Sequence, residues 1–229
     1  MNSTYIRLLL PVQNKSMGVI SFENDRWSNN RQGIEFRHRA ALSFIEKGSL
    51  LDVGCGDGLF LKMLGDKGVM AEGLDPSPVA LERAKNEGVK VTTGNLDSKL
   101  PFPDRSFDYV SALDVLEHLY NPEQLIFEMK RVARKSVIIS VPNFSSFPAR
   151  LQTLIGLVPE NNRPNKGHVY WFNYGNLRAL IIKSGMKISL KKFNTLWETV
   201  PILGNVTKLI ARLWPSAFAL SFVVRCESF

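Results

Sequence analysis

Apolar and polar residues follow two alternating patterns along this chain. Short apolar runs bounded by glycine, proline or aspartate are typical of buried strands. These runs lie at 49–54, 70–75, 89–94, 107–114, 136–142, 187–195 and 218–227. Most of the segments between them repeat apolar residues at the spacing of one helix face. The pattern therefore predicts seven strands that are separated by helices.

Several of the predicted helices carry typical end residues. Ser77 is placed to cap a helix whose first residue is Pro78, and Gly88 follows its last turn. Strands that alternate with helices favour an α/β fold, doubly wound, with a mostly parallel sheet and helices on both faces. The last two strands depart from this alternation, so we expect them to add an antiparallel edge.

The first part of the chain differs in composition from the rest. Residues 1–30 are polar and rich in Asn and Ser, which predicts a partly flexible N-terminal arm. Met17 within it is an alternative start of the natural protein. We expect residues 31–229 to form a single domain.

Charge and cysteine content narrow the function classes only slightly. The net charge of +8 favours acidic partners such as nucleic acid, anionic lipid or a phosphorylated substrate. The basic residues are scattered, however, which is typical of a solvated surface. With two cysteines, Cys55 and Cys226, and no visible secretory signal or membrane span, we expect a cytoplasmic protein.

The stretch LLDVGCGDG, residues 50–58, places three glycines between a predicted strand and a predicted helix. Such a turn at the start of a doubly wound sheet indicates a nucleotide site. A P-loop is excluded, because no Gly-Lys-Ser/Thr follows. Asp52 and Asp57 would repel a pyrophosphate and favour a cationic ligand. S-adenosylmethionine fits, since it carries a sulfonium and an ammonium but no phosphate.

The remaining parts of that ligand find partners after the next two strands. A carboxylate for the ribose is expected at the end of the second strand, and Asp75 stands there, followed by Pro76. Asn95 and Leu96 follow the third strand, where adenine would lie. The sequence thus predicts a site for S-adenosylmethionine as cofactor.

From about Ile34 onward, the chain resembles the class I S-adenosylmethionine-dependent methyltransferases, which have a Rossmann-like sheet. The stretches that carry this resemblance are LLDVGCGDG, GLDPSPVAL, LPFPDRSFDYVSALDVLEHLYNPEQLIFEMKRV and VIISVPN. Within that superfamily it is most similar to MetW, a branch named for methionine biosynthesis. GNLDSKLPFPDRSFDYV and VIISVPNFSSFPARLQTLIG carry the closer match.

The resemblance implies which residues bind the cofactor. The methionine part would lie against Asp52, Gly54, Cys55, Gly56 and Gly58. The ribose would lie at Asp75 and Pro76, the adenine between Asn95 and Leu96, and Ala112 beside the cofactor after the fourth strand. The family usually has Asp where this chain has Asn95, so we expect weaker binding but not loss of the site.

Transfer of a methyl group needs alignment, and a hydroxyl or protonated amine acceptor also needs a base. Of three histidines, His38 is expected at the surface or in packing. His118 follows the fourth strand and His168 lies in the loop after the fifth, so both are catalytic candidates. A packing role for either stays open. Tyr170, Trp171 and Phe172 line an acceptor pocket or belong to the core.

Asp114, Glu117, His118 and His168 are similar in spacing to a known metal-ligand set. The ubiquinone-biosynthesis O-methyltransferases and the small-RNA 2′-O-methyltransferases carry that set, which implies a divalent ion such as Mg²⁺, Mn²⁺ or Zn²⁺. Many relatives keep the Glu-His pair without a metal, so we expect a metal-free site, and the divalent ion is the alternative.

Three functions compete at this point. The first is methyl transfer to a small-molecule or lipid-like acceptor through oxygen or nitrogen. The second, implied by the MetW resemblance, is support of homoserine O-acetylation without methyl transfer. A nucleic-acid methyltransferase is less favoured, because ALDV stands where base-amine methyltransferases carry NPPY or DPPY. We therefore expect no nucleic-acid partner.

Residues 201–213 have the pattern of an amphipathic helix. Its apolar stripe is Ile202, Val206, Leu209, Ile210 and Leu213. Lys208 and Arg212 lie off that stripe. Two interpretations stay open: the stripe packs on the domain, or it makes a peripheral membrane contact that admits a lipid-like acceptor.

Overall fold

The computed structural model describes residues 33–163, 166–197 and 200–229, so the predicted arm 1–30 and the alternative start Met17 lie outside the described residues. Seven strands form one sheet in the order β3-β2-β1-β4-β5-β7-β6. Their bounds are β1 Ser49–Val53, β2 Met70–Asp75, β3 Lys90–Thr93, β4 Phe107–Leu113, β5 Ala133–Pro142, β6 Met186–Thr195 and β7 Ala219–Ser228.

Strands β1 to β5 pair in parallel, whereas β7 is antiparallel to both β5 and β6. The predicted sheet, mostly parallel with antiparallel pairing at one edge, is therefore confirmed. The last strand of the chain does not itself form the edge, because it inserts between β5 and β6. Phe222, Val223 and Val224 of β7 are wholly buried, while 189–192 of β6 are exposed. The more apolar strand takes the covered position, and the lysine-containing strand takes the edge.

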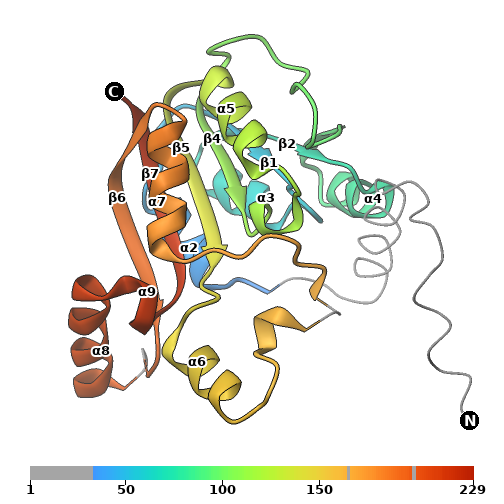
Figure 1. Cartoon of the computed structure of the whole chain (residues 1–229). Helices are drawn as coiled ribbons and strands as arrows, with labels where there is room; N and C mark the ends of the chain where they lie inside the picture. Colours follow the sequence, from blue (N-terminus) through green and yellow to red (C-terminus); the bar gives the residue numbers. More distant parts are fainter. Residues whose placement is uncertain (1–32, 164–165, 198–199) are drawn as a thin grey trace, which may run out of the picture.

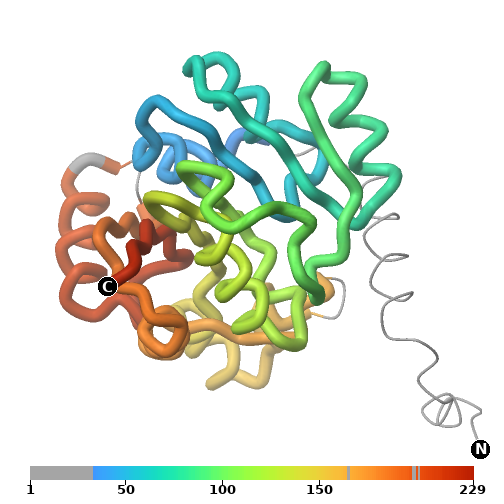
Figure 2. The backbone as a smooth tube through the Cα atoms, turned by 90° about the horizontal axis from the view of Figure 1, so that it is seen from above, coloured from blue at the N-terminus to red at the C-terminus, as the bar shows by residue number. Residues whose placement is uncertain are grey.

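Helices cover both faces of the sheet (Figures 1 and 2). Their bounds are α2 Phe36–Leu42, α3 Leu59–Asp66, α4 Pro78–Asn86, α5 Pro122–Val132, α6 Phe147–Leu154, α7 Tyr174–Lys183, α8 Pro201–Leu213 and α9 Pro215–Phe218. One core cluster includes Leu125 of α5 and Leu177 of α7, and the other includes Ala41 of α2 and Leu64 of α3. The two clusters lie on opposite sides of the sheet, as a doubly wound fold requires.

The carboxyl ends of the parallel strands meet at one edge, and the loops that follow them lie together there. Helices α6 and α8 lie at this same end of the molecule, beyond the arrowhead of β5 (Figure 1). Among the described residues, every helix is too short or too polar to span a bilayer.

Candidate functional site

The glycine turn adopts a backbone that other residues rarely accept. Gly54, Gly56 and Gly58 have φ of 76°, 55° and 80°, all in the left-handed region. A Cβ on Gly54 would lie 2.5 Å from Val115 Cγ2, and one on Gly58 would lie 2.7 Å from Val89 Cγ2. These two glycines therefore let the turn pack closely on the segments that follow β4 and α4.

Asp75 links this turn to the end of β2. Its Oδ2 accepts a hydrogen bond of 2.9 Å from Gly56 N, and its Oδ1 accepts one of 2.8 Å from Ser77 N. Ser77 caps α4 as predicted, with its hydroxyl accepting from Ala80 N at 3.3 Å. An ionised carboxylate accepts about four hydrogen bonds, and the ribose hydroxyls of the cofactor are the further partners that the sequence predicts for Asp75.

Asp52 is buried at the end of β1, where the Ser111 hydroxyl donates to its Oδ1 at 2.6 Å. Burial raises the pKa of Asp52 to about 7, while the bond from Ser111 opposes this shift and the charge of Asp75 adds to it. Two neighbouring carboxylates make the turn electronegative, which fits the sulfonium and ammonium of S-adenosylmethionine. Ser111 was not predicted from the sequence, and the sheet register that places it opposite Asp52 is seen only in the structure.

Two predicted cofactor residues are placed differently from the rest. The side chain of Cys55 belongs to the core, since a Cβ on Gly73 would come within 2.5 Å of its Sγ, so a ligand could use only its backbone. Ala112 was expected beside the cofactor after the fourth strand, but β4 continues to Leu113, so Ala112 lies inside the strand and is wholly buried. A contact with the cofactor stays a prediction and could involve only the backbone of Ala112. Leu113, which is half-buried, comes next.

The predicted adenine and ribose flanks follow β3 and β2. Asn95 is exposed, and its Oδ1 accepts from Asp97 N at 2.9 Å, which orients its amide. Leu96 beside it is buried, and Pro76 is half-buried next to Asp75. Asn95, Leu96 and Pro76 thus lie after the carboxyl ends of their strands, and they remain candidates for contact with the cofactor.

His118 and His168 come together from two separate loops. Their ring centroids are 4.9 Å apart. His118 Nδ1 lies 3.1 Å from Gly167 O, and His168 Nδ1 lies 2.7 Å from Asn161 O. A carbonyl oxygen only accepts, so each Nδ1 carries a hydrogen and Nε2 carries the lone pair of the neutral ring.

Glu117 lies close to both histidines. It lies with His118 in the short 3₁₀ helix η2, Leu116–His118, and its side chain is buried. Its backbone oxygen accepts from Val169 N at 2.8 Å and from Tyr170 N at 3.0 Å, which ties both loops together. Among the described residues, Glu117, His118 and His168 have ligand atoms within 4.8 Å of one another, close enough to hold a metal ion.

Asp114, the fourth residue of the predicted metal set, is directed elsewhere. Its Oδ1 accepts from the Ser140 hydroxyl, and its Oδ2 forms an ion pair of 3.1 Å with Arg37 Nη1. Asp114 also has a φ of 56°, which an aspartate tolerates better than most residues. The structure thus assembles three of the four candidate ligands and uses the fourth to fasten α2 to the end of β4.

Of the aromatic residues after His168, two belong to the core, and lining of an acceptor pocket stays a prediction for Trp171. Phe172 is buried in the core, and Tyr170 packs on it with ring centroids 4.8 Å apart. Trp171 is exposed. The third histidine, His38, is buried at the third position of α2, where its Nδ1 accepts from Glu35 N. His38 therefore has a packing role, which was one of the two predicted for it. Burial lowers the pKa of His38 to about 4.

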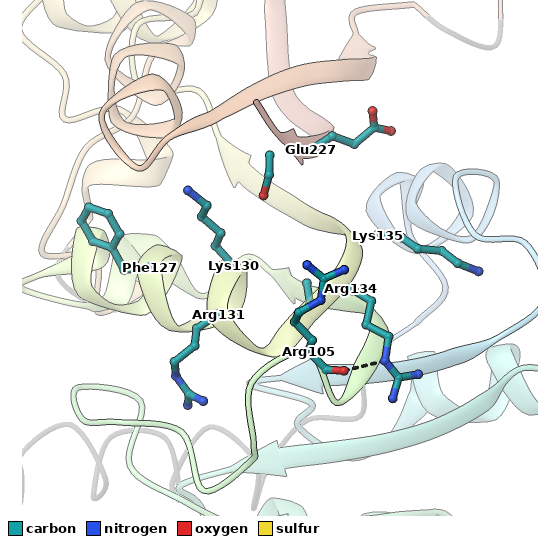
Figure 3. A pocket seen from close by; sticks show the side chains of 9 residues that line it. Arg105, Phe127, Lys130, Arg131, Arg134, Lys135 and Glu227 are labelled. Carbon is teal, nitrogen blue, oxygen red and sulfur yellow. Dashed lines mark hydrogen bonds between the residues drawn. The ribbon is translucent and has the colours of Figure 1, made fainter.

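A cavity of about 610 Å³ that is lined by several arginines and lysines lies near the starts of β4 and β5. It is thus at the end of the sheet opposite the glycine turn. Its charged side chains do not converge on one point (Figure 3). Arg131 donates to Leu100 O, Phe102 O, Asp104 and Glu128, and Lys130 donates to Ser184 O. These contacts give the two cations a structural role.

Comparison with known proteins agrees with this fold. Magnesium protoporphyrin IX methyltransferase from Synechocystis, solved with bound S-adenosylhomocysteine, aligns with a TM-score of 0.67 at 16% identity, covering 93% of this chain and all of that one. Likeness at this identity shows the fold, which is that of the class I S-adenosylmethionine-dependent methyltransferases. Within that class the chain belongs to the family of the methionine biosynthesis protein MetW, whose profile matches residues 36–218.

Curated relatives are similar over part of their length. A probable S-adenosylmethionine-dependent methyltransferase of Mycolicibacterium smegmatis is 31% identical over 143 residues, which are 61% of this chain and 52% of the relative. The mitochondrial ubiquinone biosynthesis O-methyltransferase of Schizosaccharomyces pombe is 30% identical over 116 residues, 46% of this chain and 41% of the relative. The chain spans about half the length of the first of these.

Proposed function

We propose that this protein transfers a methyl group from S-adenosylmethionine to an oxygen or nitrogen of a small-molecule or lipid-like acceptor. One observation carries the proposal: the electronegative glycine turn and the paired imidazoles of His118 and His168 lie at the same edge of the sheet. The contact between Gly54 and Val115 supports this juxtaposition, because Val115 directly precedes η2.

Each part of the site has a separate task. Asp75 binds the ribose, while Asp52 and the turn hold the methionine end. When bound, the cofactor supplies a methyl group that is already activated for in-line displacement. The site would align the acceptor atom with this methyl group, so that the acceptor would gain the methyl while sulfur would keep the electron pair of the broken bond. Nε2 of His118 or His168 takes the proton that the acceptor loses.

A hydroxyl acceptor has some support from relatives. Two relatives have names that indicate methyl transfer to an oxygen atom of their substrates. They are the ubiquinone O-methyltransferase and the 27-O-demethylrifamycin SV methyltransferase of Amycolatopsis mediterranei. Here, Phe144 packs against His168 with ring centroids 5.3 Å apart, and Trp171 is exposed nearby in the chain. Aromatic surface of this kind suits an apolar acceptor.

A divalent ion at Glu117, His118 and His168 is the alternative chemistry. The backbone carbonyl at each Nδ1 favours it, because metal-binding histidines usually donate their other ring nitrogen in this way. Such an ion would orient the acceptor and lower the pKa of its hydroxyl. Elemental analysis of the purified protein decides between an ion and a metal-free base.

Support of methionine biosynthesis without methyl transfer is the second candidate function. It is favoured by the match to the MetW family over residues 36–218. In that case the domain would act on a partner enzyme of homoserine O-acetylation. A cytoplasmic location and the absence of a nucleic-acid partner stay predictions from the sequence.

Two measurements separate these functions. Calorimetry with S-adenosylmethionine tests the cofactor site, and release of S-adenosylhomocysteine with pooled hydroxyl, amine and lipid acceptors tests transfer. Binding together with release supports the enzyme. Binding without release, combined with stimulation of homoserine O-acetylation by the added protein, would support the non-catalytic function.

A further inference from the structure

Helix α8 presents its apolar stripe to solvent except at Ile210, which is half-buried. Ile202 is 79% exposed and Leu209 is 60% exposed. The side of the helix that packs on the domain carries the small residues Gly204 and Ala211, both buried. Thr207 lies near them, and its hydroxyl donates to Leu196 O at 2.8 Å. Packing of the stripe on the domain, one of the two interpretations of this helix, is therefore wrong.

Helix α6 and the residues after it are equally apolar on the outside. Leu154 is 82% exposed. The other exposed apolar residues of this region are Phe147, Leu151, Ile155, Leu157 and Val158. Exposed apolar side chains clustered in this way mark an interaction surface, whereas single ones need no explanation.

The two helices belong to one surface. Phe147 at the start of α6 stacks on Phe218 of α9, with ring centroids 6.1 Å apart and an angle of 8° between planes. Helix α9 continues directly from α8 after Trp214. We call the exposed residues of α6, the segment 155–158 and α8 the apolar end. It lies beyond the carboxyl end of β5 (Figure 1). The loops that follow the carboxyl ends of the parallel strands, with the glycine turn and Asp75, lie at this same end of the molecule.

Charge at the apolar end is of one sign. Within residues 143–159 and 200–218 the charged residues are Arg150, Lys208 and Arg212, and the nearest carboxylates in the sequence, Glu160 and Glu198, stand just outside these ranges. Glu160 forms an ion pair of 3.3 Å with Lys166. Trp214, which is 62% exposed, ends α8, and tryptophan favours the boundary between lipid headgroups and acyl chains. Exposed apolar residues bordered by bases and free of carboxylates complement an anionic lipid surface.

We propose that the apolar end docks on an anionic phospholipid bilayer. Ile202, Leu209 and Leu154 enter the boundary of the acyl chains, while Lys208 and Arg212 contact the headgroups. This orientation turns the carboxyl edge of the sheet, with His118, toward the bilayer. A lipid-like acceptor would then reach the site from the membrane. Docking itself does not depend on methyl transfer.

Co-sedimentation with vesicles tests the proposal. The full chain is expected to sediment with vesicles of phosphatidylcholine and phosphatidylglycerol at low ionic strength, and much less with phosphatidylcholine alone. The double substitution Lys208→Gln and Arg212→Gln should lower the partition coefficient between vesicles and solution about 30-fold. Leu209→Ser should lower it roughly tenfold or more, through loss of apolar burial.

Matched controls lie away from the apolar end. The pair Lys85→Gln and Lys187→Gln removes the same charge, and Met70→Ser removes an apolar side chain that is 73% exposed, at the opposite end of the sheet. Both controls should partition like the parent. Calorimetry of each variant with S-adenosylmethionine shows that loss of vesicle binding is separate from loss of the cofactor site.

Two outcomes would overturn membrane docking. The first is a parent protein that stays in the supernatant with anionic vesicles at low salt, or variants that sediment as the parent does. The second is a dimer, seen by light scattering, that Leu209→Ser converts to a monomer while vesicles bind neither form. A second copy would then cover the apolar end.

Discussion

His118 and His168 lie with their ring centroids 4.9 Å apart, each held at Nδ1 by a backbone carbonyl of the loop that carries His168. The arrangement fixes the tautomer of both rings, because the carbonyl accepts from N–H. Both rings therefore have the proton acceptor on the same atom, Nε2. Whether one imidazole acts as base or both bind an ion, removal of either should affect the same step.

We expect His118→Gln and His168→Gln each to lower the methyl-transfer rate by roughly 10²–10⁴-fold. Neither histidine is a predicted cofactor residue, so calorimetric affinity for S-adenosylmethionine should stay near that of the parent. His38→Gln is the control, since glutamine at the third helix position can still accept the capping bond from Glu35 N. Full activity in both test variants would remove the histidines from the mechanism.

Cofactor affinity should depend on the protonation of Asp52. Its folded pKa of about 7 means that the carboxyl is neutral below that pH and charged above it. A cationic ligand prefers the charged form, so affinity should rise as pH increases through about 7. Asp52→Asn should abolish this dependence. Ser111→Ala removes a bond that lowers the pKa, so the midpoint should move to higher pH.

The protonation of Asp52 should also affect the stability of the fold, which should fall with rising pH while cofactor affinity rises. Its pKa in the folded protein lies above the ordinary value of 3.8, so the folded state binds the extra proton between these values. Without ligand, the contribution of Asp52 to the free energy of unfolding should therefore decline as pH rises from about 4 to about 7. Urea unfolding of the parent and of Asp52→Asn across this window measures it. Identical pH profiles would show that the carboxyl is not buried as described.

Asp75→Asn should weaken binding of S-adenosylmethionine by roughly 10- to 100-fold, because it removes a charge and an acceptor from the ribose contact. Gly56→Arg should act more strongly, since its φ of 55° disfavours a side chain and the space is needed by the ligand. Asp66→Asn, an exposed change at the end of α3, is the control. If calorimetry shows that the folded variants Asp75→Asn and Gly56→Arg bind S-adenosylmethionine as tightly as the parent does, the site assignment is refuted.

Arg131 is predicted to stabilise the fold without touching the site. Its guanidinium donates to two carbonyls and two carboxylates. Arg131→Met should lower the free energy of unfolding by about 2–4 kcal/mol, and Arg134→Met, which loses one exposed bond, by less than about 1 kcal/mol. Urea denaturation compares them, and equal effects would contradict this difference.

The sequence by itself determined the strands, most of the helices and the glycine turn, whereas helix α6, Phe147–Leu154, was not predicted. Strand and helix periods, the Ser77 cap and the spacing from the glycines to Asp75 are local features, set by backbone geometry within short segments. For that reason the alternating elements, the bounds of α8 and the residues at the carboxyl edge were predictable before the sheet order was known.

Only the tertiary structure decided which distant groups meet. Insertion of β7 beside β5, the direction of Asp114 toward Arg37, and the burial of Ala112 all depend on contacts between segments far apart in the chain. The outward stripe of α8 is of the same kind, because periodicity marks an apolar face but not what covers it. Pairing and packing are selected by the burial of the whole sheet, and no single segment contains that information.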